Sequence, residues 1–182
     1  MLDDTGHVFA TGVLNSKTAP ETGGSMPVRM PGKMTWRVPG IHGSARIETS
    51  FGQLPVQALR RNDTVLTRSG AFVAVERVER IDLDAQFLAL HPVSHPVRIP
   101  AGSLGYHMPS RDLLLSAGQI LQVPGLSQGA SRCVAGSLAG RQGIVRQAVS
   151  DLSYYIVHCG GPATIRVEGV WLEVAASQAD RG

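Results

Sequence analysis

Cysteine is scarce in this chain of 182 residues, which contains only Cys133 and Cys159. Two cysteines are too few for a disulfide framework, and they lack the paired spacing that is typical of a zinc site. The sequence therefore predicts no metal, no cofactor and no disulfide-stabilised fold.

Long hydrophobic runs are also missing. Apolar stretches such as Leu113–Leu115 are short, whereas a membrane-spanning helix needs about 20 consecutive apolar residues. The start, Met1-Leu2-Asp3-Asp4, is acidic where a secretory signal peptide carries a basic region. We therefore expect a soluble protein that does not bind membranes, with the cytoplasm as its default location. Non-classical secretion stays compatible with the sequence.

Aromatic residues make up only 5% of the chain, and charged residues 17%. The formal net charge is +3, but the basic residues are scattered, and only Arg60 and Arg61 are adjacent. Proteins that bind nucleic acids usually show a basic stripe, often with stacking aromatic residues. The sequence thus indicates no nucleic-acid partner. Because 43% of the residues are hydrophobic, we expect the chain to fold around a buried core.

The first 35 residues differ in composition from the rest. Lys17–Ser25 is dense in Pro, Gly, Ser and Thr, which is typical of a linker. We therefore expect a flexible N-terminal arm at 1–35, a folded domain at 36–175 and a C-terminal tail at 176–182. The arm is either a free linker or a segment that docks in a partner groove, because it carries methionines and prolines that suit an irregular surface: Met1, Met26, Met30, Met34, Pro27 and Pro31.

From Trp36 onward, short apolar and β-branched stretches alternate with turn residues, which predicts an all-β domain of many short strands. The Gly- and Ser-rich stretch 128–143, which holds Cys133, is expected to be a loop. The expected strands are Ala45–Thr49, Thr64–Thr67, Phe72–Ile81, Val97–Ile99, Leu113–Leu115, Ile120–Val123, Tyr154–Cys159, Ala163–Val167 and Val170–Val174.

Two stretches have the pattern of short helices instead. In Leu83–Leu90 the apolar residues Leu83, Phe87 and Leu90 recur at helical spacing, with Asp82 as the expected N-cap. Residues 56–59 are predicted to form a single helical turn. Asn62 is expected to close that turn, because Asn accepts a left-handed backbone more readily than most residues.

Four blocks of the sequence occur in the order and at the separations of a known family. In the first, residues 45–67, a strand, a Gly turn, a Pro-Val-x-x-Leu turn and a strand beginning Asn62-Asp63-Thr64-Val65-Leu66-Thr67 follow one another. Residues 96–105, 112–116 and 167–174 supply the other blocks. Together they resemble the Hint (hedgehog/intein) domain of the bacterial type over about residues 36–175, although Asn62 stands where that family usually has Gly.

This resemblance implies a flat all-β fold whose active members cleave their own backbone. The reaction needs a thiol or hydroxyl at the first residue of the domain, to attack the preceding carbonyl carbon. It also needs a His, three residues after a Ser or Thr, to strain and protonate the scissile amide. Intein-type members end in His-Asn, and the Asn cyclises to release the segment that follows.

Position by position, the resemblance implies that these groups are lost here. The nucleophile's place falls on Gly40, which has no side chain. Ser116-Ala117-Gly118-Gln119 occupies the Ser-x-x-His block, and Gln119 is neither an acid nor a base at ordinary pH. Glu173 and Val174 stand where inteins carry the terminal His and Asn.

Neighbouring residues offer an alternative. Ser44, preceded by Gly43, could undergo an acyl shift with His42 as its base, because residues i and i+2 of an extended chain share a face. The competing interpretation is an ordinary solvated turn.

His158 and Cys159 are further candidate cleft residues, together with Ser116. In an extended strand adjacent side chains point to opposite faces, so His158 and Cys159 are not expected to pair. Cys159 is then a small buried residue. His91 and His95 are interpreted as loop histidines, because Pro92 and Pro96 rule out a continuous helix that would present both to a metal.

Two functions follow from these observations. The first is a catalytically degenerate Hint domain that acts as a binding or structural module, with a peptide or protein segment in the former groove of the scissile peptide. If the chain's own arm is that segment, residues 26–40 should be ordered against the domain. The second is an active self-processing Hint domain that uses Ser44 or a cysteine as nucleophile.

Overall fold

The computed structural model describes residues 36–127 and 129–175, so the expected arm and tail, and most of the stretch 26–40, lie outside the described residues. The elements in the described part are β1 (Ile41–His42), β2 (Arg46–Thr49), β3 (Gly52–Pro55), η1 (Val56–Ala58), β4 (Thr64–Leu66), β5 (Phe72–Leu83), α1 (Ala85–Leu90), η2 (Pro92–Ser94), β6 (Val97–Ile99), β7 (Leu113–Leu115), β8 (Ile120–Ser127), β9 (Gly129–Val134), η3 (Ala135–Leu138), β10 (Val145–Arg146), β11 (Leu152–Cys159), β12 (Ala163–Val167) and β13 (Val170–Val174).

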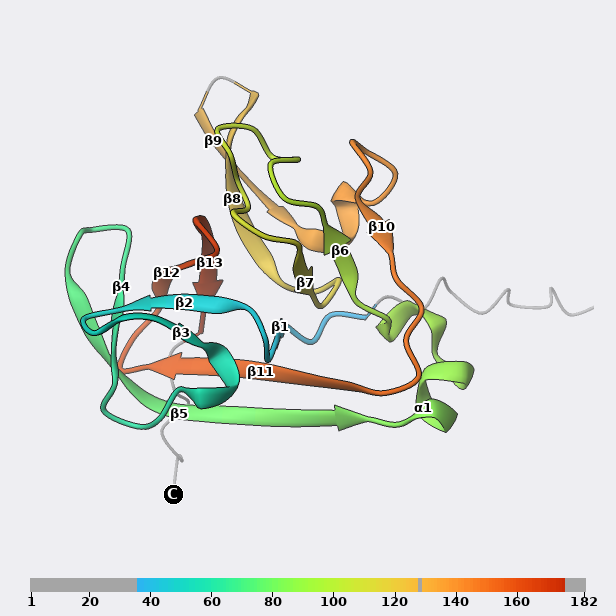
Figure 1. The fold of residues 1–182 in the computed structure, drawn as a ribbon, viewed down its shortest axis with the longest axis horizontal. Coiled ribbons are helices and arrows are strands. Elements are labelled where there is room, and N and C mark those ends of the chain that lie inside the picture. Colours follow the sequence, from blue (N-terminus) through green and yellow to red (C-terminus); the bar gives the residue numbers. More distant parts are fainter. Residues whose placement is uncertain (1–35, 128, 176–182) are drawn as a thin grey trace, which may run out of the picture. The chain divides into compact units, whose positions relative to one another are not determined.

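The strands of the described residues form one antiparallel sheet in the order β10-β6-β7-β1-β11-β5-β4-β2-β12-β13-β8-β9, and β3 pairs with β2 beside this path. The strands β5 and β11 run side by side over most of their length, from Leu152 opposite Leu83 to Cys159 opposite Val75 (Figure 1). The two-residue strand β1 lies between β7 and β11. Residues that are distant in sequence therefore meet at β1.

The all-β class that the sequence predicts is confirmed. Strands β6, β7, β12 and β13 have the predicted bounds, and β2, β4, β5, β8 and β11 overlap their predicted ranges. The prediction of a loop over residues 128–143 is wrong, because β9 pairs with β8 and η3 follows it. Backbone pairing with a neighbouring strand compensates there for a Gly- and Ser-rich composition that by itself favours a loop.

The helix that is predicted over Leu83–Leu90 begins later than expected. Leu83 is the last residue of β5, and the N-cap of α1 is Asp84, not Asp82: the Asp84 carboxylate accepts a hydrogen bond from Phe87 N–H at 2.8 Å. The buried residue of α1 is Leu88, whereas Leu90 is exposed. The residues at helical spacing therefore do not share one helix face, because Leu83 belongs to β5 and Leu90 is exposed.

The helical turn that is predicted over residues 56–59 is confirmed as the 3-10 turn η1. Asn62 follows it in the left-handed region, at φ 72°. With six residues, α1 is the longest helix described, and no helix in the described residues has the length to cross a bilayer.

Two apolar clusters hold the sheet together. The larger one gathers buried residues from nearly every strand, among them Ile41 of β1 and Leu115 of β7. The smaller one packs Leu88 of α1 against Tyr154 of β11, which is fully buried. Trp36 lies against this smaller cluster, with its ring 5.9 Å from that of Phe87 in an edge-on arrangement. The chain that enters β1 is thus anchored to the core four residues before Gly40.

Candidate peptide groove at Gly40

Residues 37–40 lie along the loop that follows β7. The Ser116 hydroxyl donates a hydrogen bond to the carbonyl oxygen of Val38, and Ser116 N–H donates to the carbonyl oxygen of Gly40 at 2.9 Å. Ser116 is fully buried. Its hydroxyl also accepts a hydrogen bond from Gly118 N–H at 3.2 Å, which fixes its orientation. Ser116 therefore binds the entering chain at that chain's carbonyl oxygens, once through its hydroxyl and once through its own N–H group.

Gln119 contacts the peptide bond between Pro39 and Gly40, where the resemblance places the first residue of the domain. Gly40 N–H donates to Gln119 Oε1 at 3.1 Å, and the Gln119 side-chain amide donates to the carbonyl oxygens of Glu173 at 2.8 Å and Ile120 at 3.1 Å. The side chain is buried, and its donors and its acceptor are all used. An amide has no titratable proton, so Gln119 holds the Pro39–Gly40 bond without being able to protonate it.

Two glycines allow the chain to pass this closely. A Cβ added at Gly40 would lie 2.7 Å from Tyr154 Cβ, and one at Gly118 would lie 2.4 Å from the carbonyl carbon of Arg37. Both separations are below those that real side chains adopt. Gly40 thus has no room for a nucleophilic side chain while Tyr154 keeps its position.

Glu173 and Val174, near the end of the domain, lie beside Gln119. Gln119, Glu173 and Val174 line a small cavity of about 20 Å³ together with Pro39, which is room for about one water-sized molecule. The Glu173 carboxylate pairs with Arg132 at 2.8 Å and accepts a hydrogen bond from Gln122. Hydrogen bonding to Arg132 lowers the pKa of Glu173. The structure therefore brings together the positions where the resemblance implies lost groups.

Ser44 and His42 form a separate contact at the end of β1. The Ser44 hydroxyl lies 2.8 Å from His42 Nδ1, and Ser44 N–H donates to the same nitrogen at 3.4 Å. Because an N–H group can only donate, Nδ1 is the acceptor in both contacts. Burial lowers the pKa of His42, which favours the neutral ring that can accept a proton.

The carbonyl group before Ser44 is also held. Gln57 N–H donates to the carbonyl oxygen of Gly43 at 3.1 Å, and a Cβ at Gly43 would lie 2.7 Å from Tyr155 Cε2. Ser44 is exposed, whereas Gly43 is buried. The Ser44 hydroxyl, the His42 ring and the Gly43 carbonyl group are thus adjacent. They form a site of their own, which does not include Gly40.

His158 and Cys159 lie outside the cavity at Gly40. His158 Nε2 is 3.3 Å from the Glu79 carboxylate and 3.4 Å from an Arg77 nitrogen, and its Nδ1 is buried without a hydrogen-bond partner among the described residues. Cys159 lines a different pocket, beyond a β-bulge between His158 and Cys159. Burial raises the pKa of the Cys159 thiol, which leaves it protonated near neutral pH.

Sequence reasoning missed the residue that closes the Gly40 site, Tyr154. A glycine at position 40 and a second at 118 were the only signals for a close approach of two chain segments. They do not say what approaches. Within the described residues, no group of three or more His, Cys, Asp or Glu side chains is placed to hold a metal ion.

The described geometry is that of a sheet whose first short strand pairs with β7 on one side and with β11 on the other. The family model of the Hint domain matches residues 39–179, and the chain belongs to this family. None of the curated proteins matches it.

Solved inteins share the fold. The gp41-1 intein has a TM-score of 0.50 at 9% identity, with 74% of this chain and 98% of that chain covered. A variant of the MchDnaB-1 intein has a TM-score of 0.50 at 10% identity, with 75% of this chain and 99% of that chain covered. A variant of the Ssp DnaB mini-intein has a TM-score of 0.51 at 10% identity, with 81% of this chain and 100% of that chain covered. At this level of identity the likeness concerns the fold alone.

Proposed function

We propose that this Hint domain no longer cleaves its own backbone and instead serves as a binding or structural module that holds an extended peptide in the groove at Gly40. Its own residues 37–40 are the occupant. The observation that carries the proposal is the contact of Gln119 with the Gly40 amide at a position where Tyr154 leaves no space for a side chain. The peptide-holding contacts are present, whereas the reacting groups are not.

The chemistry supports an inert site. Attack on the Pro39 carbonyl carbon requires a nucleophile on residue 40, and glycine has none. Departure of the amide nitrogen requires a proton donor, and the Gln119 amide is bound to Gly40 through its oxygen, not through a titratable group. The attack on the carbonyl carbon therefore lacks a nucleophilic side chain, and the departure of the amide nitrogen lacks a proton donor.

The contacts also indicate how the groove recognises the segment that it holds. Ser116, Gln119 and Gly118 meet the occupant through its backbone atoms. Main-chain recognition of an extended segment tolerates many side chains, as in the addition of a strand to a sheet edge. A glycine at the place of Gly40 is the one strict requirement, because Tyr154 blocks every other residue.

Mass spectrometry of the purified full-length chain tests this proposal. We expect a single species at 19.3 kDa after several days at neutral pH with added dithiothreitol, which would release a thioester. A fragment that ends at Pro39 would overturn the proposal, since it would mean that the Gly40 bond is broken without a side chain at that position.

A second candidate function is self-cleavage at the Gly43–Ser44 bond, and the 2.8 Å contact of Ser44 with His42 is the observation in its favour. The Ser44 hydroxyl would attack the Gly43 carbonyl carbon and pass its proton to His42 Nδ1. The C–N bond would break as that proton reaches the Ser44 nitrogen, which lies 3.4 Å from the same atom. Water would then hydrolyse the ester, leaving a carboxylate on Gly43.

The same mass measurement separates the two candidates. Self-cleavage at this site would give two fragments divided after Gly43. Ser44→Ala would abolish them, whereas Ser50→Ala, at another exposed serine, would not. Persistence of the fragments in Ser44→Ala would exclude Ser44 as the nucleophile. An intact wild-type chain would exclude the second candidate and support the first.

A further inference from the structure

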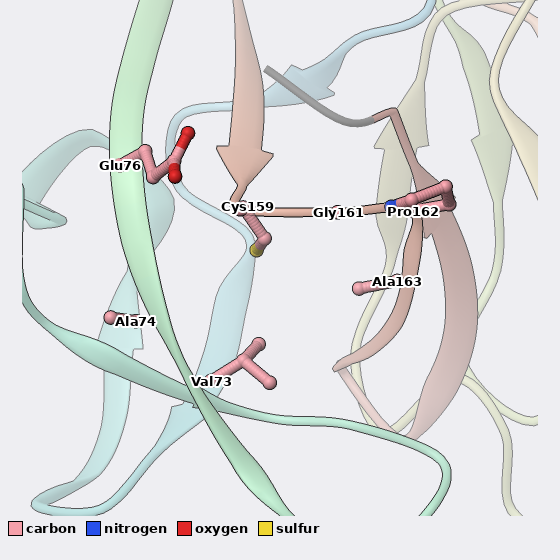
Figure 2. A pocket seen from close by; sticks show the side chains of 8 residues that line it. Val73, Ala74, Glu76, Cys159, Gly161, Pro162 and Ala163 are labelled. Atoms are coloured by element: carbon pink, nitrogen blue, oxygen red, sulfur yellow. The ribbon is translucent and has the colours of Figure 1, made fainter.

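A pocket at the far end of β11 is not used by either candidate function. It has a volume of about 430 Å³, within the range of about 300–1,000 Å³ typical of small-molecule sites. In Figure 2, Val73 and Glu76 come from β5, Cys159 from the end of β11, and Pro162 and Ala163 lie across from them. It shares no lining residue with the cavity at Gly40.

The walls of this pocket are mainly apolar. Val73, Ala74, Pro162 and Ala163 supply aliphatic surface, and two glycines at 160 and 161 leave the side toward the turn open. A Cβ at Gly161 would meet nothing within 4 Å. A ligand with an apolar body can therefore be desolvated against these walls.

One carboxylate stands over this apolar surface. In the pairing of β5 with β11, His158 faces Arg77 and Cys159 faces Val75, so Glu76 is the extra residue of a bulge. Bulges turn a side chain away from the regular alternation of a strand. A Cβ at Gly160 would lie 3.1 Å from Glu76 Oε1, so the glycine makes room for this carboxylate. In the described residues, Glu76 has neither a hydrogen bond nor an ion pair, unlike Glu79 on the same strand.

We propose that this pocket binds a small organic ammonium ion, with Glu76 pairing with the cationic group and Val73, Pro162 and Ala163 holding an apolar body. The unpaired carboxylate supplies the charge complementarity, and the volume fits a ligand of small-molecule size. The site is independent of the groove at Gly40 and of the self-cleavage question.

The test uses phenethylammonium as the probe and 2-phenylethanol as its neutral counterpart. Binding to the full-length chain is followed through the backbone amide chemical shifts of Gly160 and Gly161. We expect saturable shifts with phenethylammonium and a response to 2-phenylethanol that is weaker by up to about fivefold, as one exposed charge pair contributes modestly. Equal responses to the two probes, or no shift at 20 mM phenethylammonium, would overturn the proposal.

Two variants sharpen the result. Glu76→Gln should weaken phenethylammonium binding by up to about fivefold, whereas Glu79→Gln, three residues further along β5 and outside the pocket, should not. Equal effects of the two glutamate variants would contradict a site at Glu76.

Discussion

Tyr154 decides which residue can stand at position 40. Its Cβ lies where any side chain of residue 40 would begin, and its ring is buried in the smaller core cluster. The phenol donates a hydrogen bond to the carbonyl oxygen of Ser94 at 3.0 Å, and burial raises its pKa. Tyr154 is thus held from both ends, so a larger residue at 40 has to displace a well-anchored side chain.

Gly40→Ala should therefore destabilise the domain. We expect a loss of about 1–3 kcal/mol in the free energy of unfolding, the usual cost of forcing an extra methyl group into a packed interior. Urea unfolding of the variant and the wild type measures the difference. Gly161→Ala is the matched control, because its new Cβ meets nothing within 4 Å. Equal effects of the two substitutions would show that Tyr154 yields without cost.

Restoring the family's reacting groups should not restore the reaction. In the double variant Gly40→Cys with Gln119→His, the new thiol collides with Tyr154, and the imidazole replaces an amide that now holds the carbonyl of Glu173. A reactive geometry needs supporting residues that orient each group, and here Tyr154 occupies the space beside residue 40. We expect the double variant to stay intact by mass spectrometry, like each single variant. Rapid thiol-induced cleavage at Pro39 would refute this expectation.

At the scale of elements, the sequence pattern locates α1 but misplaces its start. An N-cap needs a side-chain oxygen that reaches the N–H group of the first turn, and that depends on where β5 ends. Because β5 continues to Leu83 in its pairing with β11, the helix begins two residues later than the periodicity suggests. Asp82 instead pairs with Arg80 at 2.7 Å and accepts a hydrogen bond from Ser153.

Asp84→Ala should remove the cap of α1. We expect a loss of about 1 kcal/mol in the free energy of unfolding, because Phe87 N–H loses its acceptor at the start of the helix. Asp84→Asn is the control, since its side-chain oxygen can still accept this hydrogen bond. Thermal unfolding followed by circular dichroism measures both variants. A loss of the same size in Asp84→Asn would point to the charge of Asp84 instead of its cap.

At the scale of the whole molecule, acid should weaken the fold in two steps. Burial lowers the pKa of His42 below its ordinary 6.5, so protons bind the unfolded chain more readily than the folded one. The contribution of His42 is present above pH 6.5 and is lost as the pH falls through its folded-state pKa. Arg132 lowers the pKa of Glu173 below 4.5, so its contribution is lost at lower pH in the same direction.

We therefore expect the urea midpoint to be highest above pH 6.5, to fall as the pH drops below 6.5, and to fall again below pH 4.5. Unfolding curves at half-unit intervals of pH measure both steps. His42→Gln should flatten the upper step and leave the lower one, because Gln does not titrate. A midpoint that rises on acidification from pH 7 to 5 would contradict the lowered pKa of His42.

Short strands that are bounded by turn residues were predicted with their bounds, as β6 and β7 illustrate. In both strands the first and third residues are buried and the middle one is half-buried, so the local pattern and the final environment agree. By contrast, β1, β3, β9 and β10 were not predicted. Two residues carry too little pattern to be recognised, and β9 exists because its backbone pairs with β8.

The amino-acid sequence by itself determined the all-β class and the family resemblance, since these depend on composition and on the order of short motifs along the chain. Only the tertiary structure decided that Gln119 holds the Gly40 amide, that Tyr154 excludes a side chain there and that Ser44 meets His42 at 2.8 Å. The physical reason is that these are contacts between chain segments. Gln119 and Gly40 are 79 residues apart, and their separation in space is set by the pairing of β1 with β7 and β11.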